Sequence, residues 1–511
     1  MLRHRRILLI VCCLMVVGSI SATLAYAYRL RSSGYRELVQ ARLSDKLRMR
    51  VSLGSIEPLS LRARRFHDVR LRLPRRDVEV FRCGQAVWHD ESTSGAPGFS
   101  LDLRDGWMLA GTDEWDRDDY RAMLLGGLGH DFAALGIKRI TLDDIDLQWS
   151  HPRFALMSEG CSGDIVFRGD GTARATLAAD RLNGAPVDEP ISIVADLTPG
   201  QAPQFHHVVL KLPEIPIAAL KLDALVGGAV TRGSFTGQLA FRQRGTSWSV
   251  GIDGRVRNAE LRELSAALPG GPYDGGLDIQ VDEATIDQSG LRDLRFSGRL
   301  DGLSVGQLVP MFGLPPQAGT VALRVHQAAY QSGRITYLSA EGSAGGLSLT
   351  DLSTLIGRGK ITGTADVTIE SMMVVDDRLT LAAVTIAATP PAGAAGTIDR
   401  VMLQNASQRL LGFDVTPMLP ESTEFIEYEK LGVRLDLNGG ALRVHGTHGD
   451  DGRTILTVNL FGRPLGVIKE PKRSFDVSGY LDAMTRRVGT YDADQLREWW
   501  RAREAGGDEG M

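Results

Sequence analysis

Hydrophobic positions in the middle of the chain follow a pattern that returns every 44 residues. The clearest copies are short stretches with apolar residues three positions apart, as on one side of a helical turn. These copies are Ile217-Ala-Ala-Leu220, Leu261-Arg-Glu-Leu264, Val305-Gly-Gln-Leu308 and Leu349-Thr-Asp-Leu352. A fixed period of this size is typical of proteins built from stacked copies of one unit. The sequence therefore predicts repeats that each carry a short helix.

Apolar and polar residues alternate after each helical stretch. The alternating runs open at Gly275, Gly319 and Gly363, which are again 44 residues apart. A period of two indicates a β-strand with one wet face and one face that must be covered. We predict that one apolar face carries Leu277, Ile279, Val281, Val321, Leu323, Val325, Val367 and Ile369.

Similar alternation before and after the repeats indicates a mainly β protein. We expect an elongated, twisted β-sheet or groove built from repeats, with short helices, after one N-terminal transmembrane helix. Pro/Gly-rich joins at 199–203 and 390–396 flank the repeats. The predicted parts are an anchor or signal (1–30), an N-terminal β-groove module with a helical insert (31–205), the repeat module (206–396), a C-terminal β module (397–482) and a terminal helix and tail (483–511).

Residues Ile7 to Tyr28 carry no charge over 22 positions, which is long enough to cross a bilayer as a helix. Ala25-Tyr26-Ala27 resembles a signal-peptidase site, so a cleaved signal peptide is the alternative to a retained anchor. Basic residues lie on both sides of the segment and leave its orientation ambiguous. Because large domains translocate despite such charges, we expect the β-rich body outside the cytoplasm.

A basic helix is expected directly after this segment. Tyr35, Val39, Leu43 and Leu47 form an apolar stripe along it. The stripe would lie either against lipid headgroups or against the first strands of the body. At the other end of the chain, Trp499 and Trp500 pose a similar choice between a membrane interface and a helix docked on the sheet.

Composition narrows the function classes. The 511 residues carry a net charge of −4, and no basic run is interleaved with aromatic residues, so nucleic acid is not an expected partner. Of the four cysteines, Cys83 and Cys161 lie in the body. Outside the cytoplasm they would either form a disulfide or remain two free thiols. No Cys-x-x-Cys motif or Cys/His cluster suggests zinc.

One catalytic motif occurs, within the repeats. Gly302-Leu-Ser-Val-Gly306 matches the Gly-x-Ser-x-Gly elbow of α/β-hydrolases. However, Ser304 corresponds to Ser348 in the next repeat, and both serines precede a short apolar helix. We therefore predict that they cap helix N-termini, and we expect no catalytic residue and no enzymatic activity.

Two polar stretches resemble metal sites only weakly. A predicted helix from Thr112 to Leu135 begins with several acidic residues, but it lacks the central Gly and final Glu of a calcium loop. His445 and His448 would point to opposite faces of a strand, so we expect a solvated hairpin tip. We expect no metal and no cofactor, because no nucleotide-binding fingerprint is present either.

Two alternating stretches carry a family resemblance. The first is Val51-Ser-Leu-Gly-Ser-Ile-Glu-Pro-Leu-Ser-Leu, running on to Val69-Arg-Leu-Arg-Leu-Pro74, and the second is Tyr428-Glu-Lys-Leu-Gly-Val-Arg-Leu-Asp-Leu-Asn-Gly-Gly-Ala-Leu-Arg-Val444. With the N-terminal apolar segment and the helix after it, they resemble the AsmA-like proteins of bacterial envelopes, in the bridge-like lipid transfer superfamily. The resemblance implies a β-groove with an apolar floor that carries lipids between membranes. The regular, helix-bearing repeats depart from a plain groove.

These observations lead to two functional hypotheses. The first is an extracytoplasmic β-groove protein, anchored in the inner membrane through residues 7–28, that conducts phospholipid or another acyl lipid between envelope membranes. The second is a non-enzymatic envelope scaffold or outer-membrane assembly factor whose apolar face is closed by protein. Both place the body in the periplasm, where outer-membrane or other envelope proteins are the expected protein partners.

Overall fold

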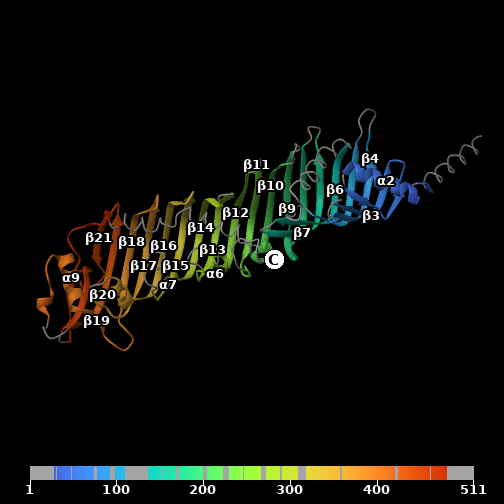
Figure 1. Ribbon diagram of the computed structural model, residues 1–511. Helices are drawn as coiled ribbons and strands as arrows, with labels where there is room; N and C mark the ends of the chain where they lie inside the picture. The colour runs from blue at the N-terminus through green and yellow to red at the C-terminus, as the bar shows by residue number, and fades with distance from the viewer. Residues whose placement is uncertain are drawn as a thin grey trace, which may run out of the picture. The chain divides into compact units, whose positions relative to one another are not determined.

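The computed structural model describes the chain from residue 28 to residue 481 with gaps (Figure 1). The gaps are 30, 48, 74–76, 93–97, 110–135, 152–153, 169–171, 199–203, 222–228, 245–246, 266–271, 288–289, 309–317, 357–358, 420–423, 461 and 480. The anchor predicted over 7–28, apart from Tyr28, the helix predicted over 112–135 and the terminal helix lie outside the described residues. No helix within the described part is both long enough and apolar enough to span a membrane.

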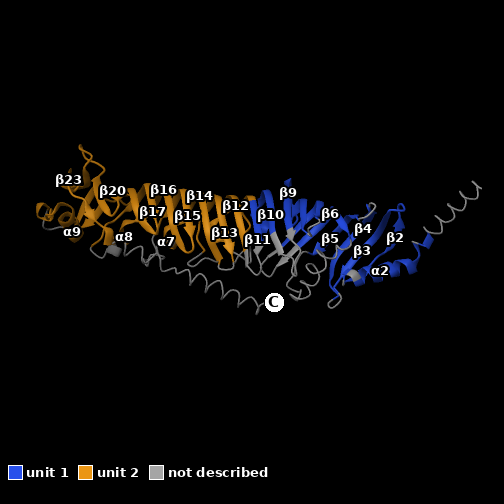
Figure 2. Ribbon diagram, turned by 90° about the horizontal axis from the view of Figure 1, so that it is seen from above, with its two compact units in different colours: residues 1–224, 238–248 blue, residues 225–237, 249–511 orange. Residues whose placement is uncertain are grey.

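The chain forms two compact units (Figure 2). Unit 1 contains residues 1–224 and 238–248, and unit 2 contains residues 225–237 and 249–511. Strand β11 (Ser234–Arg244) has residues in both units. Most described residues of each unit lie in β-strands, and the helices are few and short. The prediction of a mainly β protein is confirmed.

Unit 1 is an open, twisted sheet that starts beside one helix. Its elements are α2 (Ser33–Leu47), β1 (Arg50–Ser52), β2 (Ser55–Pro58), β3 (Ala63–Arg72), β4 (Glu79–Asp90), β5 (Phe99–Leu109), β6 (Ile137–His151), β7 (Phe154–Phe167), β8 (Ala173–Leu182), β9 (Ala185–Thr198), β10 (Gln204–Pro216) and the 3-10 helix η2 (Ile217–Leu220). Strands β1 and β2 both pair with β3, and each later strand pairs with the next. The β5–β6 pair is parallel, whereas the other pairs described in this unit are antiparallel.

Unit 2 is also built mainly from antiparallel β-strands. Its elements are β12 (Ser247–Glu260), α6 (Leu261–Leu264), β13 (Gly276–Asp287), β14 (Gly290–Ser304), α7 (Val305–Leu308), β15 (Thr320–Gln331), β16 (Arg334–Ser348), α8 (Leu349–Ile356), β17 (Thr364–Val375), β18 (Arg378–Thr389), β19 (Gly396–Asp399), α9 (Arg400–Leu411), η4 (Thr416–Met418), β20 (Phe425–Asn438), β21 (Ala441–Gly446), β22 (Thr454–Leu460), β23 (Arg463–Lys469) and β24 (Phe475–Asp476). Strands β12 to β18 pair in sequence order, and β20 pairs with β18.

The 44-residue repeat predicted from the sequence is confirmed. Helical turns begin at Ile217, Leu261, Val305 and Leu349. In three successive copies, the first helical amide donates to the carbonyl of the glycine that precedes the next strand: Leu261 N to Gly275 O (2.9 Å), Val305 N to Gly319 O (3.0 Å) and Leu349 N to Gly363 O (3.0 Å). The register also shifts at two places in each of the pairs β13–β14, β15–β16 and β17–β18, and both shifts return at positions 44 residues apart. Such β-bulges bend a strand, so the strands of each repeat bend at equivalent positions.

The two serines of the repeats lie where the sequence predicts them. Ser304 is the last residue of β14 and Ser348 is the last residue of β16, and each directly precedes a helix. Ser348 Oγ accepts a hydrogen bond from the backbone N–H of Asp351 at 3.2 Å, which satisfies an amide in the first turn of α8. Ser348 therefore acts as an N-cap.

Helix α2 settles the choice left open for its apolar stripe. Tyr35, Val39, Leu43 and Leu47 pack on a core formed by Val51, Leu53 and Ile56. Polar contacts hold the same side of the helix, because Arg36 Nη1 donates to Gly54 O at 2.9 Å and Gln40 Nε2 donates to Leu53 O at 3.3 Å. The stripe is covered by the first strands, and the alternative in which it faces lipid headgroups is wrong.

Candidate functional site

The eight apolar residues predicted for one face do lie on one face of unit 2. They come from β13, β15 and β17, and the intervening strands place further residues between them. Residues opposite each other on paired strands share a face. Leu323, for example, lies between Leu300 of β14 and Gly342 of β16, and Val325 lies between Gly298 and Ala340.

The register aligns these side chains in apolar rows that cross the strands. One row runs through Leu277, Leu300, Leu323, Gly342, Ile369, Val384 and Leu435. A second row runs through Leu303, Val321, Ala344, Val367, Ile386 and Val433. We call the surface formed by these rows the repeat face. It extends without interruption from β13 to β20.

The predicted residues lie on three of the seven strands that form the repeat face. Leu300 and Phe296 of β14, and Val384 and Ile386 of β18, were not predicted as members. Their own alternation was the available signal. It was weak because glycine and alanine, such as Gly298 of β14 and Ala340 of β16, occupy apolar positions in the strands that were missed.

Burial distinguishes the repeat face from a closed core. Of the eight predicted residues, Val281 and Val325 are buried, whereas the other six are only partly buried. In unit 1, by contrast, the apolar residues of the sheet include fully covered ones: Leu142 is 2% exposed and Ile193 is 1% exposed. A small core cluster lies between β14 and β17, with Val325, Ala328 and Ala340 at its centre. The repeat face therefore keeps apolar area that the described residues do not cover.

Two positions of the repeat face are glycines, which project no side chain from it. Gly298 and Gly342 are 44 residues apart, and each lies directly beside a neighbouring strand. A Cβ on Gly298 would lie 2.2 Å from Asp278 O and 2.7 Å from the Ile279 Cα, and a Cβ on Gly342 would lie 2.3 Å from Ala322 O. Any side chain there would push the strands apart, so both positions require glycine.

The opposite side of the same strands is polar and carries paired charges. Arg324 and Glu341 form an ion pair of 3.6 Å, and Arg434 and Glu370 form one of 2.8 Å. Arg295 also contacts Glu283. These side chains are well exposed, so each pair contributes at most about 1 kcal/mol. The charges identify the wet face of the sheet and no binding site.

The apolar side of unit 1 contains the two cysteines of the body. Cys83 and Cys161 are free, fully buried thiols, and desolvation by burial raises the pKa of each to about 12. The register places Gly106 of β5 and Ile145 of β6 between them. Three strand spacings amount to roughly 14 Å, well beyond the reach of a disulfide. The alternative of two free thiols is therefore the one that the structure adopts.

The two histidines near the C-terminal strands have separate partners. His445 lies 3.4 Å from Asp436 through Nε2 and 3.4 Å from Glu470 through Nδ1. His448 Nε2 lies 3.1 Å from Thr457 Oγ1, and burial, together with nearby Lys430, lowers the pKa of His448. Across the described ranges, no group of three or more His, Cys, Asp or Glu residues is arranged to hold a metal ion.

A shallow polar pocket on unit 1 was not predicted from the sequence. It lies over β4, β5 and β6 and includes His89, Asp102, Ser100 and Glu91. His89 Nε2 lies 3.0 Å from Asp102 Oδ2, while Ser100 donates its hydroxyl hydrogen to Glu91 at 2.7 Å. Ser100 is hydrogen-bonded to Glu91 and His89 is paired with Asp102, so the serine and the histidine do not form a nucleophile–base pair.

No family model, no curated protein and no solved structure matches this chain.

Proposed function

We propose that this chain is a membrane-anchored, non-enzymatic protein of the bacterial envelope that binds lipids along the repeat face and conducts them between envelope membranes. The proposal places the body in the periplasm and the segment 7–28 in the inner membrane, as a single-pass anchor. The observation that carries it is the partial exposure of six of the eight apolar residues in rows that cross the strands without interruption.

The repeat face suits an acyl chain in both chemistry and regularity. Each methylene removed from water contributes about 0.8 kcal/mol, so ten methylenes would contribute several kcal/mol even when only half covered. Because the bulges and glycines return every 44 residues, neighbouring positions along the rows offer similar surfaces. A bound chain would then move between positions of similar free energy, which favours passage over permanent storage.

A closed scaffold is the second candidate, and the end of unit 2 favours it. Fourteen buried residues form one core there, including Leu403 of α9, Leu456 of β22 and Tyr428 of β20. The Tyr428 hydroxyl donates to Thr362 O at 2.6 Å, which ties the core to the segment between α8 and β17. This end of the sheet is covered by protein, as the whole face would be in a scaffold or assembly factor.

Photocrosslinking in living cells separates the two candidates. A photoreactive amino acid replaces Leu323 on the repeat face or, in the matched control, Arg324 on the wet face of the same strand. We expect lipid adducts, identified by mass spectrometry, at position 323 and far fewer at position 324. Equal lipid labelling at both positions, or labelling by protein alone at 323, would refute lipid binding on this face. A reporter fused at Met511 that is active only in the cytoplasm would refute the proposed topology.

A further inference from the structure

Basic residues are concentrated in one stretch of this acidic chain. Residues 29–82 contain 15 Lys and Arg against 6 Asp and Glu, a net charge of +9, whereas the whole chain carries −4. This stretch includes α2 and β1 to β3, and it begins directly after the uncharged residues 7–28. Anionic lipid headgroups attract positively charged residues, so a basic stretch next to such a segment is suited to contact a membrane surface.

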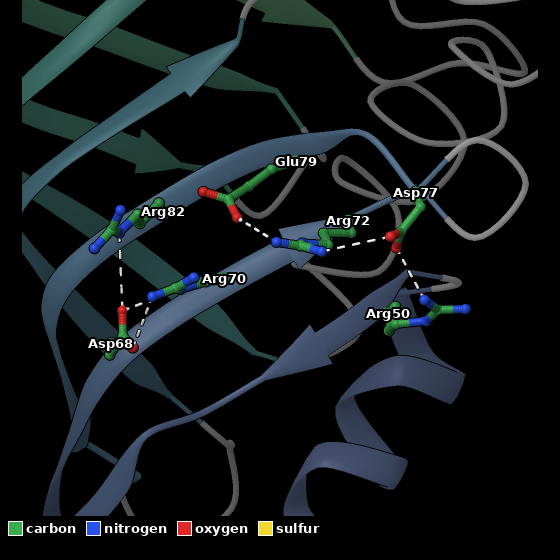
Figure 3. Close-up of polar contacts among 7 residues, drawn as sticks. All are labelled: Arg50, Asp68, Arg70, Arg72, Asp77, Glu79 and Arg82. Carbon is green, nitrogen blue, oxygen red and sulfur yellow. Dashed lines mark hydrogen bonds and ion pairs between the residues drawn. The ribbon is translucent and has the colours of Figure 1, made fainter.

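Part of this charge is paired among residues of β1, β3, β4 and the turn between β3 and β4 (Figure 3). Arg72 contacts both Asp77 at 3.4 Å and Glu79 at 3.2 Å, and Asp77 also contacts Arg50 at 2.9 Å. Asp68 is shared by two further arginines, Arg70 at 3.1 Å and Arg82 at 3.8 Å. Four guanidinium groups thus meet three carboxylates, and Arg50 and Arg82 remain at least half exposed.

Exposed apolar side chains lie at the end of unit 1 where the chain leaves residues 7–28. The turn between β2 and β3 carries Leu61, which is 82% exposed, and Leu59, which is 42% exposed. Tyr28 is 80% exposed. The turn is next to the start of α2, because Arg64 Nη1, three residues after Leu61, donates to Tyr35 Oη at 2.9 Å.

A leucine that is 82% exposed on a turn leaves most of its apolar side chain in water. Arg62 follows Leu61 directly and is exposed, and Arg29 and Arg31 are exposed shortly before α2 begins at Ser33. Exposed leucines and exposed arginines at one end of a unit are typical of surfaces that enter the headgroup region of a bilayer. The neighbouring uncharged segment favours a bilayer over a protein partner, since a membrane-spanning segment would bring the bilayer to this end of unit 1.

We propose that Leu59 and Leu61 insert into the surface of the membrane that holds residues 7–28, while Arg29, Arg31 and Arg62 contact its anionic headgroups. This seating surface goes beyond lipid binding on the repeat face and rests only on the proposed anchor. It would hold the first strands of unit 1 against the bilayer.

Site-specific fluorescence on the full chain tests the seating surface. Cys12 and Cys13 are replaced by Ser, and Leu61→Cys then carries an environment-sensitive dye; Cys83 and Cys161 are fully buried and stay unlabelled. The protein is reconstituted into vesicles of phosphatidylethanolamine and phosphatidylglycerol that contain a lipid spin-labelled near its headgroup. The matched control is Leu465→Cys on β23, where Leu465 is 48% exposed.

We expect at least about threefold stronger quenching at position 61 than at position 465, and a loss of about half of that quenching when Arg29, Arg31 and Arg62 are replaced by Gln. Equal quenching at the two positions overturns the proposal. The proposal is also overturned if the dye at position 61 is shielded from water in cells but not in vesicles, because a protein partner would then cover this surface. Full quenching that survives the three Gln substitutions overturns the part assigned to the arginines. Lipid crosslinking at Leu323 is measured independently, so failure here leaves the lipid-binding proposal intact.

Discussion

Substituting Leu323 by Asp places one charge in the middle of the repeat face. Leu323 lies between Leu300 and Gly342 and is only partly buried. Its neighbour on the same face, Val325, is 5% exposed and belongs to a small buried cluster with Ala328 and Ala340. The two positions therefore offer a matched pair on one strand, one partly open and one closed.

The structure sets different magnitudes for the two positions. Fully burying a leucine side chain contributes roughly 1.5–3 kcal/mol, so losing a partly buried one costs about 1–2 kcal/mol if the new carboxylate stays hydrated. A carboxylate forced into a dry core without a partner costs several kcal/mol, comparable to much of the 5–15 kcal/mol that stabilises a typical domain. Leu323→Asp should therefore fold, whereas Val325→Asp should be severely destabilised.

Three measurements follow from this difference. Urea unfolding should give a loss of about 1–2 kcal/mol for Leu323→Asp. The folded variant should co-purify with less lipid and should fail to complement a deletion, because an acyl chain would have to pass a charge. Arg324→Asp serves as the control on the wet face: Arg324 is 65% exposed and its pair with Glu341 is 3.6 Å long, so stability and lipid load should change little.

Two results would refute this reasoning. If Leu323→Asp unfolds outright, the repeat face is a dry protein core and the scaffold becomes the better proposal. If Leu323→Asp keeps its full lipid load and its activity, lipids do not pass this repeat.

Two further predictions concern close packing and burial. Gly298→Ala should lower the free energy of unfolding in urea by about 1–3 kcal/mol, because the new Cβ would lie 2.2 Å from Asp278 O. Gly345→Ala is the control and should be almost neutral, because the nearest atom to its new Cβ is 3.5 Å away. Equal costs for the two substitutions would contradict the close approach of the strands at Gly298. Burial raises the pKa of both Cys83 and Cys161 from 9.0 to about 12, so the folded state keeps neutral thiols that the unfolded state ionises. The thiols' contribution to folding stability is therefore complete below pH 9 and is lost as the pH rises from 9 toward 12. Between about pH 8 and about pH 10.5, the Cys83→Ala/Cys161→Ala variant should lose less unfolding free energy than the unsubstituted protein. Equal losses in the two proteins would contradict this assignment.

Local pattern was sufficient for the repeat architecture. The starts of the helical turns at Ile217, Leu261, Val305 and Leu349 follow from apolar spacing within a few residues. The strands follow from alternation, which depends only on the chain's own pleat. Ser348 as an N-cap is equally local, since its partner amide is three residues away.

Contacts between distant residues decided what local pattern left open. The apolar stripe of α2 is covered because Val51 and Ile56 reach it from later strands, and the sequence of the helix alone is equally compatible with a lipid surface. Cys83 and Cys161 remain free because the register inserts Gly106 and Ile145 between them, and register depends on pairing across the whole sheet. The partial exposure of Leu323 beside the buried Val325 has the same origin: alternation assigns both to one face, but only the neighbouring strands determine how deeply each is covered.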